Sequence, residues 1–529
     1  MRIGGIVAAA AVVLALPSSS RAQDTIPERA SFYLLLRGDT IFEERSARTP
    51  TELSGEFVDR LRGARVSYTA ALAPNALVTR IDMRTYRTTD DTAGEKASFV
   101  IDGDSVVAQI GSAPPALLPS ASGALVIINP AAAFLEQMAR RARTFRSDSV
   151  AMFVFVLGAP QPIAAIVRRI GPDSVRLDYA SASIRLAVSP EGRVLGGVVP
   201  AQGVTIARGP ARPSLRAART DYTAPRDAPY TAEDVVVTTP AGLRLTGTLT
   251  VPRGRPSGRA PAVVTITGSG PEDRDEQSGV IPGYRPFREL ADTLGRRGIA
   301  VLRLDDRGVN RSDAGPPSAT SADFADDIRA AVAYLRARPE IDAARIALVG
   351  HSEGGIIAPM VAVGDSAIRG IVLMAGTAST GREIVAEQNR YVIDSVRRIA
   401  GAQRDSAIAR SRRGADSLAA KSPWLRYFFD YDPTEIARRV RTPVLILHGE
   451  TDRQVSPTEA QKLAGAFRAG GNRDVTVRLF PATDHLFVED ASGAFMDGEG
   501  RLRYTSLPSL HVRREVLGAI ADWLASHFR

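Results

Sequence analysis

The stretch Arg345-Ile-Ala-Leu-Val-Gly-His-Ser-Glu-Gly-Gly355 decides the fold that we expect for this chain. A run of apolar residues ends in Gly350-His351-Ser352-Glu353-Gly354, and a segment of small residues compatible with a helix follows. This is the G-x-S-x-G pattern between a strand and a helix, where it marks a nucleophilic serine. Glycines are needed two residues before and after that serine, because a Cβ atom would collide with the adjoining strand and helix. The stretch therefore predicts a nucleophile elbow at Ser352.

Length and charge narrow the function classes. A chain of 529 residues has room for two or three domains. The formal net charge is +9, and only three of the 67 basic residues are lysines. The arginines are scattered among 58 acidic residues, whereas a nucleic-acid binder should show a basic stripe or a recognisable module. We therefore expect no nucleic-acid partner.

The first 22 residues read as a secretory signal peptide. Met1-Arg2 gives a positive start, Ile6 to Leu16 is an apolar core, and Ser20-Arg21-Ala22 offers a cleavage site. No other stretch reaches membrane-spanning length, so we expect no stable membrane insertion. The chain has no cysteine and hence neither a disulfide nor a lipid-bearing cysteine. These features predict an exported protein, in a periplasm or outside the cell.

Residues 24–208 form a first unit with strand-like periodicity. Val175, Leu177 and Tyr179 alternate with polar residues, and turn-forming sequences separate such runs. We expect a mainly antiparallel, meandering sheet with a helix near residues 130–143. The unit has no histidine, and its acids are expected in turns or on polar strand faces, which leaves its role open between binding and packing. The stretch at 209–230 is rich in Pro, Arg and Ala and is predicted to be a linker.

Residues 231–529 alternate between strand and helix, which indicates an α/β domain with a parallel-type sheet covered on both faces. An opening hairpin is expected around Pro240-Ala241-Gly242, and a long charged segment at about 377–439, containing Trp424, is expected to form a helical lid. The other predicted elements are strands at 262–267, 299–304, 370–374, 443–448 and 475–480, and helices at 286–297, 321–338 and 510–528.

A serine hydroxyl is a poor nucleophile at neutral pH and needs a base within hydrogen-bond reach. Of the five histidines, His485 lies in a loop just past an apolar strand, where it can reach over the strand tips. The acid that orients this base should come from another strand-end loop. Asp452 follows His448-Gly449, with Glu450 as the competitor two residues earlier. We therefore expect a triad of Ser352, His485 and Asp452.

The order of these motifs resembles that of the α/β-hydrolase family, over about residues 231–529. Thr267-Gly268-Ser269-Gly270-Pro271 follows the third strand, where that family keeps its oxyanion loop. Asp305-Asp306-Arg307-Gly308, with Ser312 beyond, looks like the family's D-x-R-G-x-G-x-S loop, although Asn310 replaces the second glycine. The stretch from Gly268 to Glu276 is similar to the G-S-G-P-x-D-R-D-E stretch of bacterial esterases and serine-aminopeptidase-like hydrolases.

The resemblance implies an acyl-enzyme mechanism without a metal or organic cofactor. The oxyanion would lie between the backbone N–H of Glu353 and one from Ser269 or its neighbour. No Cys/His cluster or H-E-x-x-H pattern suggests a metal site. The expected function is hydrolysis of small carboxylic esters or short acyl substrates.

Two alternatives stay open. A serine aminopeptidase would use the same triad but would need an acidic anchor for a free amino terminus, which Glu353 or a lid carboxylate could supply. A non-catalytic binding protein would use the β-rich unit as its working part. The sequence leaves acyl chain length, leaving group and oligomeric state undetermined.

Overall fold

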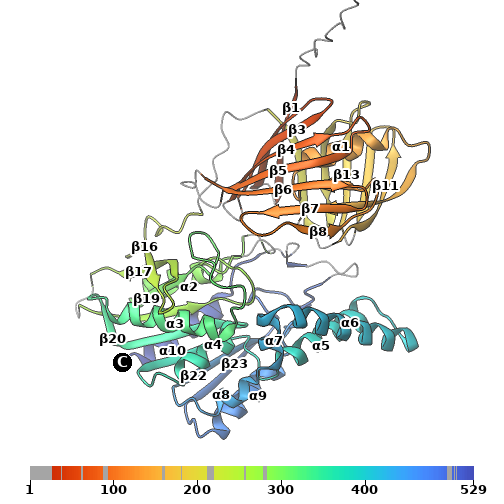
Figure 1. Cartoon of the computed structure of the whole chain (residues 1–529). Coiled ribbons are helices and arrows are strands. Elements are labelled where there is room, and N and C mark those ends of the chain that lie inside the picture. The colour runs from red at the N-terminus through yellow and green to blue at the C-terminus, as the bar shows by residue number, and fades with distance from the viewer. Residues whose placement is uncertain are drawn as a thin grey trace, which may run out of the picture.

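A computed structural model describes residues 27–529, except 37–38, 61–63, 87–92, 158–160, 180–181, 211–219, 255–257, 278–280, 282, 497–502, 505–506 and 508. Its strands form two sheets, one of 15 strands and one of eight (Figure 1). The predicted signal peptide at residues 1–22 lies outside the described residues, so export stays a prediction.

The N-terminal sheet consists of two meanders that share one seam. The first and last strands of the unit, β1 and β15, pair antiparallel and join the meander β1–β8 to the meander β9–β15. Among its described strands, every pair of neighbours is antiparallel except β9 and β10. The mainly antiparallel β domain is therefore confirmed. Its strands are β1 Glu28–Leu36, β2 Asp39–Arg48, β3 Glu52–Asp59, β4 Ala64–Leu72, β5 Val78–Tyr86, β6 Glu95–Asp102, β7 Ser105–Ile110, β8 Ala116–Pro119, β9 Leu125–Ile127, β10 Ser149–Val156, β11 Ile163–Gly171, β12 Ser174–Tyr179, β13 Ala182–Val188, β14 Val194–Val199 and β15 Val204–Gly209.

Helix α1 (Ala132–Ala142) completes the core of this unit, close to the predicted position. Its buried residues pack in one cluster with side chains from both meanders. Four of the described acids of the unit are buried as well, because Glu44, Glu43, Glu136 and Asp59 are 0, 3, 5 and 8% exposed. The expectation that the acids of this unit lie in turns or on polar faces is therefore wrong for these buried acids, Glu44 and Glu136 foremost.

The C-terminal sheet has the order β16-β17-β19-β18-β20-β21-β22-β23. Strands β18 to β23 pair in parallel, while the predicted opening hairpin β16–β17 makes the sheet mixed. Its strands are β16 Tyr230–Thr238, β17 Arg244–Pro252, β18 Ala260–Ile266, β19 Ala300–Leu304, β20 Ile341–His351, β21 Ile368–Met374, β22 Val444–Gly449 and β23 Val475–Phe480.

Helices cover both faces of this sheet (Figure 1). Because successive strand residues point to opposite faces, one core cluster packs on helices α3, α4 and α9 and the other on helices α2 and α10. The helices are α2 Pro286–Arg296, α3 Ser321–Arg336, α4 Gly354–Ala362, α9 Thr458–Ala469 and α10 Arg514–His527. Helix α10 begins later than the predicted Leu510, since His511 and the N–H of Val512 instead bond to Glu289 of α2.

The lid predicted between β21 and β22 is helical. It contains α5 Gly381–Tyr391, a short π-helix Val392–Val396, α6 Gly401–Lys421, α7 Pro423–Asp430 and α8 Pro433–Ala437. Helix α7 packs against α3 and α5, whereas α6 extends outward with almost all of its residues at least partly exposed (Figure 1). The lid therefore touches the sheet domain mainly through α7 and α8.

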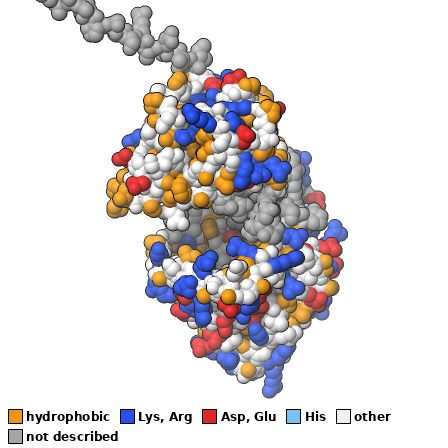
Figure 2. Space-filling view, turned by 90° about the vertical axis from the view of Figure 1, so that its right-hand side faces the viewer, with side chains coloured by type: hydrophobic (Ala, Val, Ile, Leu, Met, Phe, Trp, Pro, Cys, Tyr) orange, Lys and Arg blue, Asp and Glu red, His pale blue; other side chains and the backbone are white. Residues whose placement is uncertain are grey.

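The surface mixes charges of both signs. On the face drawn in Figure 2, basic and acidic side chains are interspersed over the described residues rather than gathered in a stripe. Among the described helices, none is long and apolar enough to cross a membrane.

Candidate active site

Ser352 sits at the turn between β20 and α4 in a left-handed conformation, with φ of 52°. A Cβ on Gly350 would come 2.1 Å from the Gly354 carbonyl oxygen, and one on Gly354 would come 2.2 Å from that of Ile266. Both distances are impossible for real Cβ atoms. The two glycines are therefore required by the close approach of the backbone around the strained serine.

The structure brings the three residues of the expected triad together. Nε2 of His485 lies 3.3 Å from Oγ of Ser352, and Nδ1 of His485 lies 2.8 Å from Oδ2 of Asp452. His485 follows β23, Asp452 follows β22, and both side chains are buried. Glu450, the competing acid, is exposed. This arrangement is suited to transferring a proton from Ser352 to His485 while Asp452 holds the ring.

Asp452 is built to stay ionised in a buried place. Burial opposes its charge, but the charges and hydrogen bonds of His485 and His448 outweigh burial and hold the pKa of Asp452 below its usual range. Its Oδ1 accepts the N–H groups of Gln454 and Val455 at 2.8 and 2.9 Å. The loop thus fixes one carboxylate oxygen and leaves the other for the two histidines.

The loop after β18 supplies an N–H beside the serine. The Gly268 N–H donates to Glu272 and Glu276 at 3.0 and 3.1 Å, so it is already used. The N–H groups of Ser269 and Glu353 have no hydrogen bond to another described backbone or side-chain group. Those two N–H groups, the expected pair, are therefore available to receive an oxyanion.

The Glu353 side chain accepts hydrogen bonds from three parts of the domain: the loop after β18, helix α3 and lid helix α7. It is 3% exposed and accepts hydrogen bonds from Oγ of Ser269, Oγ of Ser321 and Nε1 of Trp424, at 2.7, 2.6 and 2.9 Å. Burial raises its pKa above the ordinary value despite these donors. One carboxyl group thus ties the oxyanion loop, helix α3 and lid helix α7 to the elbow.

A second acid–histidine pair, Glu276 and His351, lies next to the nucleophile, because His351 directly precedes Ser352. His351 places Nδ1 at 2.5 Å from Oε1 of Glu276 and Nε2 at 2.9 Å from the His485 carbonyl oxygen. The sequence interpretation gave neither His351 nor Glu276 a role. Glu276 stood in a recognised stretch, but nothing in a sequence pattern shows that it reaches both Gly268 and the residue before the nucleophile.

The acidic and basic residues of the loop Asp305-Asp306-Arg307 bind partners on neighbouring elements. Asp305 pairs with Arg274 at 2.6 Å, and Arg307 pairs with Asp327 of α3 at 2.7 Å. Asp306 accepts the Thr267 hydroxyl at 2.7 Å. These contacts hold the loops after β18 and β19 together.

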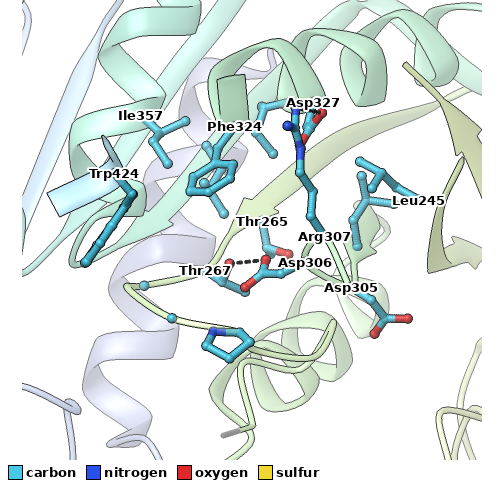
Figure 3. A pocket seen from close by; sticks show the side chains of 16 residues that line it. Leu245, Thr265, Thr267, Asp305, Asp306, Arg307, Phe324, Asp327, Ile357 and Trp424 are labelled. Atoms are coloured by element: carbon cyan, nitrogen blue, oxygen red, sulfur yellow. Dashed lines mark hydrogen bonds and ion pairs between the residues drawn. The ribbon is translucent and has the colours of Figure 1, made fainter. Parts of the chain in front are cut away.

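A cavity of about 220 Å³ lies beside the oxyanion loop (Figure 3). Trp424 of the lid, Phe324 of α3 and Ile357 of α4 form its apolar end, and the Arg307–Asp327 pair stands at the other. Gly268 lines it too, and a Cβ on that glycine would lie 3.5 Å from Cβ of Ser352. The cavity is therefore next to the serine across the oxyanion loop.

The second half of the predicted linker packs on this region. The Tyr222 hydroxyl donates to Asp273 at 2.9 Å, and the Arg274 guanidinium lies 4.3 Å from the Tyr222 ring centre. Residues 211–219 of the linker are outside the described part. Tyr222 therefore packs on the loop after β18 in the C-terminal domain, and this part of the predicted linker is not a free connection.

Comparisons with known proteins agree with this architecture. Residues 280–497 match the model of the Alpha/beta hydrolase family. The chain is 30% identical to Esterase EstD of Thermotoga maritima over 290 residues. This alignment covers 53% of this chain and 65% of the relative. The chain thus spans slightly less than two thirds of that relative's length.

Two of the solved structures that resemble the chain are an esterase and a hydrolase. An esterase of Pyrococcus furiosus has 16% identity and a TM-score of 0.40, covering 59% of this chain and 96% of that one. A 2,6-dihydroxy-pseudo-oxynicotine hydrolase has 17% identity and a TM-score of 0.37, covering 56% and 68%.

Proposed function

We propose that this protein is an α/β-hydrolase and a serine hydrolase that cleaves carboxylic esters, because residues 280–497 match that family's model and the chain is 30% identical to an esterase over 290 residues. The observation that carries the proposal is the chain of contacts from Ser352 through His485 to Asp452. The esterase relative supports the ester bond as the target.

In the proposed mechanism Ser352 attacks the ester carbonyl while Nε2 of His485 takes the hydroxyl proton. The tetrahedral oxyanion is held by the N–H groups of Ser269 and Glu353. His485 then gives the proton to the leaving alcohol, which departs and leaves an acyl group on Ser352. A water molecule, deprotonated by His485, releases the acid and restores the serine.

The alternative of an aminopeptidase loses its proposed anchor. Glu353 is buried and already accepts three hydrogen bonds, which makes it a poor anchor for a substrate amine. Two of the lid carboxylates, Glu383 and Asp394, are likewise held by Thr380 and Arg404. An exposed lid acid such as Glu387 is the anchor that an aminopeptidase would have to use. An ester substrate, which needs no acidic anchor, is therefore favoured.

The cavity beside the oxyanion loop favours a small apolar substituent. Its volume of about 220 Å³ is below the range of roughly 300–1,000 Å³ of sites that enclose drug-sized ligands. A short acyl chain or a single ring fits such a space. We propose small esters as substrates, acted on after export through the predicted signal peptide.

The test is hydrolysis of p-nitrophenyl acetate and butyrate by Ser352→Ala. We expect a loss of kcat on the order of 10³-fold or more, because the nucleophile is gone while the fold remains. Ser366→Ala, at an exposed serine one helix away, is the matched control and should match the wild type. Turnover by Ser352→Ala above about a tenth of the wild-type rate, far beyond that expectation, would refute both the esterase mechanism and the choice of nucleophile.

A further inference from the structure

The buried ring of His351 has an acceptor at each nitrogen. A carbonyl oxygen can only accept, so Nε2 must donate to the His485 main chain, 2.9 Å away. The 2.5 Å contact between Nδ1 and Oε1 of Glu276 then holds a second proton between ring and carboxyl group. Burial opposes a charged ring, but Glu276 foremost, then the His485 carbonyl and Asp452, raise the pKa of His351 above its ordinary value. The pair is thus a buried histidine and carboxyl group joined by a short hydrogen bond, in which Glu276 favours the charged form of the ring.

Glu276 adopts a conformation that needs an explanation. Its φ is 64°, in the left-handed region that side chains other than glycine seldom adopt. Such strain persists only where the surroundings hold it, and it gathers at functional sites. Oε1 of Glu276 accepts the Gly268 N–H at 3.1 Å as well as facing His351. One oxygen therefore joins the oxyanion loop to the residue that precedes the nucleophile.

His351 in turn supports the base. Besides its hydrogen bond to the His485 carbonyl, its ring lies 5.0 Å from the His485 ring, centre to centre, and meets the Phe487 ring edge-on at 6.1 Å. The loop that carries His485 has left-handed residues at Ala482 and Phe487, so its own conformation is strained. The contacts of the His351 ring with the His485 main chain and ring therefore support His485 at hydrogen-bond distance from Ser352.

We propose that Glu276 and His351 are positioning residues, a buried hydrogen-bonded pair that holds His485 and the oxyanion loop in place around Ser352. The proposal rests on the proposed function, since it assigns a role in turnover at Ser352. Neither residue touches the substrate. They act through the Gly268 N–H on one side and the His485 main chain on the other.

Other titratable groups surround this pair. They are Glu272, which shares the Gly268 N–H, Asp306 after β19, Asp452 after β22, the base His485, and Tyr284 ahead of α2. Burial first, and then repulsion from Glu276, raises the pKa of Glu272 well above its ordinary value. Glu272 therefore holds its proton more readily than a free carboxyl group, and Glu276 is the residue of the two that contacts His351.

The experiment compares Glu276→Gln, His351→Gln and the double variant on p-nitrophenyl acetate. Active sites are first counted with a fluorophosphonate, so that kcat refers only to folded, reactive protein. We expect each single change to lower kcat per site on the order of 10- to 100-fold, the cost of a small misplacement of reacting groups, with KM near the wild-type value. The double variant should lose no more than the larger single loss, because the two residues work as one unit.

Glu289→Gln is the matched control, because Glu289 also pairs with a histidine, His511, but outside the site. Its kcat per site should equal that of the wild type. Unchanged kcat per site in both single variants, losses that multiply in the double variant, or a rise in KM alone would each overturn the proposal. So would absence of reactive sites in both single variants, since the pair would then serve folding. If Ser352→Ala is inactive and Glu276→Gln is normal, only this proposal fails. If Ser352→Ala is active, the proposed function fails.

Discussion

Glu44 of the N-terminal sheet and Asp452 of the C-terminal sheet are both fully buried carboxyl groups, yet their pKa values move in opposite directions. Burial raises the pKa of Glu44 to about 7, in spite of hydrogen bonds from the Tyr68 hydroxyl at 2.6 Å and the Ala133 N–H at 3.1 Å. Asp452 has two histidines on one oxygen, and its pKa is held below the usual range.

The difference separates a structural carboxyl group from one suited to chemistry. Glu44 joins strand β2 to the first turn of α1, and the neutral acid serves that purpose. Asp452 stays charged where water is excluded, and in the proposed mechanism this charge offsets the imidazolium that forms on proton transfer. Burial alone therefore does not mark a catalytic acid; what distinguishes Asp452 is that its buried carboxylate holds a histidine that faces a serine.

Among the variants that test this contrast between Glu44 and Asp452, we expect the largest loss of activity from Asp452→Asn. The amide can still accept the N–H groups of Gln454 and Val455, but it presents a donor to Nδ1 of His485. The ring then takes the wrong tautomer, at a cost on the order of 10³–10⁴-fold in kcat. The measurement is kcat/KM on one activated ester at neutral and mildly alkaline pH.

Glu450→Gln is the matched change two residues earlier and should stay near the wild type, because Glu450 is exposed and away from His485. If Glu450→Gln is the crippled variant and Asp452→Asn is active, the acid has been assigned to the wrong residue.

A change at Glu44 should alter the stability of the fold and its dependence on pH, and not the activity. Its folded pKa of about 7 lies above the ordinary 4.5, so the folded state holds the proton more tightly. Its contribution is fully present below about pH 4.5 and is lost as the pH rises through about 7, amounting to roughly 3 kcal/mol at about 1.4 kcal/mol per pH unit. Glu44→Gln mimics the neutral acid and should abolish this loss, so that above pH 7 the variant unfolds at higher denaturant than the wild type.

The readout is denaturant unfolding across that pH range, with Glu52→Gln at an exposed position of β3 as control. This prediction is contradicted if the unfolding free energy of the wild type does not fall between pH 4.5 and about 7, or if it falls equally in Glu44→Gln. Either result would show that Glu44 is ionised in the folded state. Ester hydrolysis should be unaffected in Glu44→Gln.

A smaller effect is expected at the junction of the two sheets. A chain starting at Thr220 keeps Tyr222 on Asp273 and Arg274, whereas one starting at Pro229 loses these contacts. Loss of a buried hydrogen bond and a cation–π contact costs about 1–3 kcal/mol. We expect both chains to react with a fluorophosphonate, and the shorter to melt a few degrees lower, on the order of 2–4 °C per kcal/mol at this size. Equal melting temperatures would show that Tyr222 is dispensable.

The triad geometry could be anticipated because each member follows from a local pattern. Ser352 lies at a strand-to-helix turn, while Asp452 and His485 each follow an apolar strand, and parallel strands bring such loops to one edge of the sheet. The positioning pair could not be anticipated. Its formation depends on the left-handed backbone of Glu276, a residue that no turn pattern favours there.

The burial of Glu44 had a signal that was overlooked. Glu43 and Glu44 are neighbours on β2, and successive strand residues point to opposite faces, so both cannot lie on the solvent side. Glu44 faces the core, and Glu43 is also covered and pairs with Arg60 at 3.0 Å. The meander was readable from turns and alternation, but the closing pair β1–β15 joins the two ends of the unit, which no local pattern indicates.

The most direct test of the central claim is the site of covalent labelling. Trypsin releases residues 346–369 as one peptide, which contains Ser352 and Ser366. After reaction of the wild type with a fluorophosphonate, fragmentation of this peptide should place the adduct on Ser352, and His485→Ala should label far more slowly. An adduct on Ser366 or on another peptide, no adduct at all, or equal labelling without His485 would contradict the account.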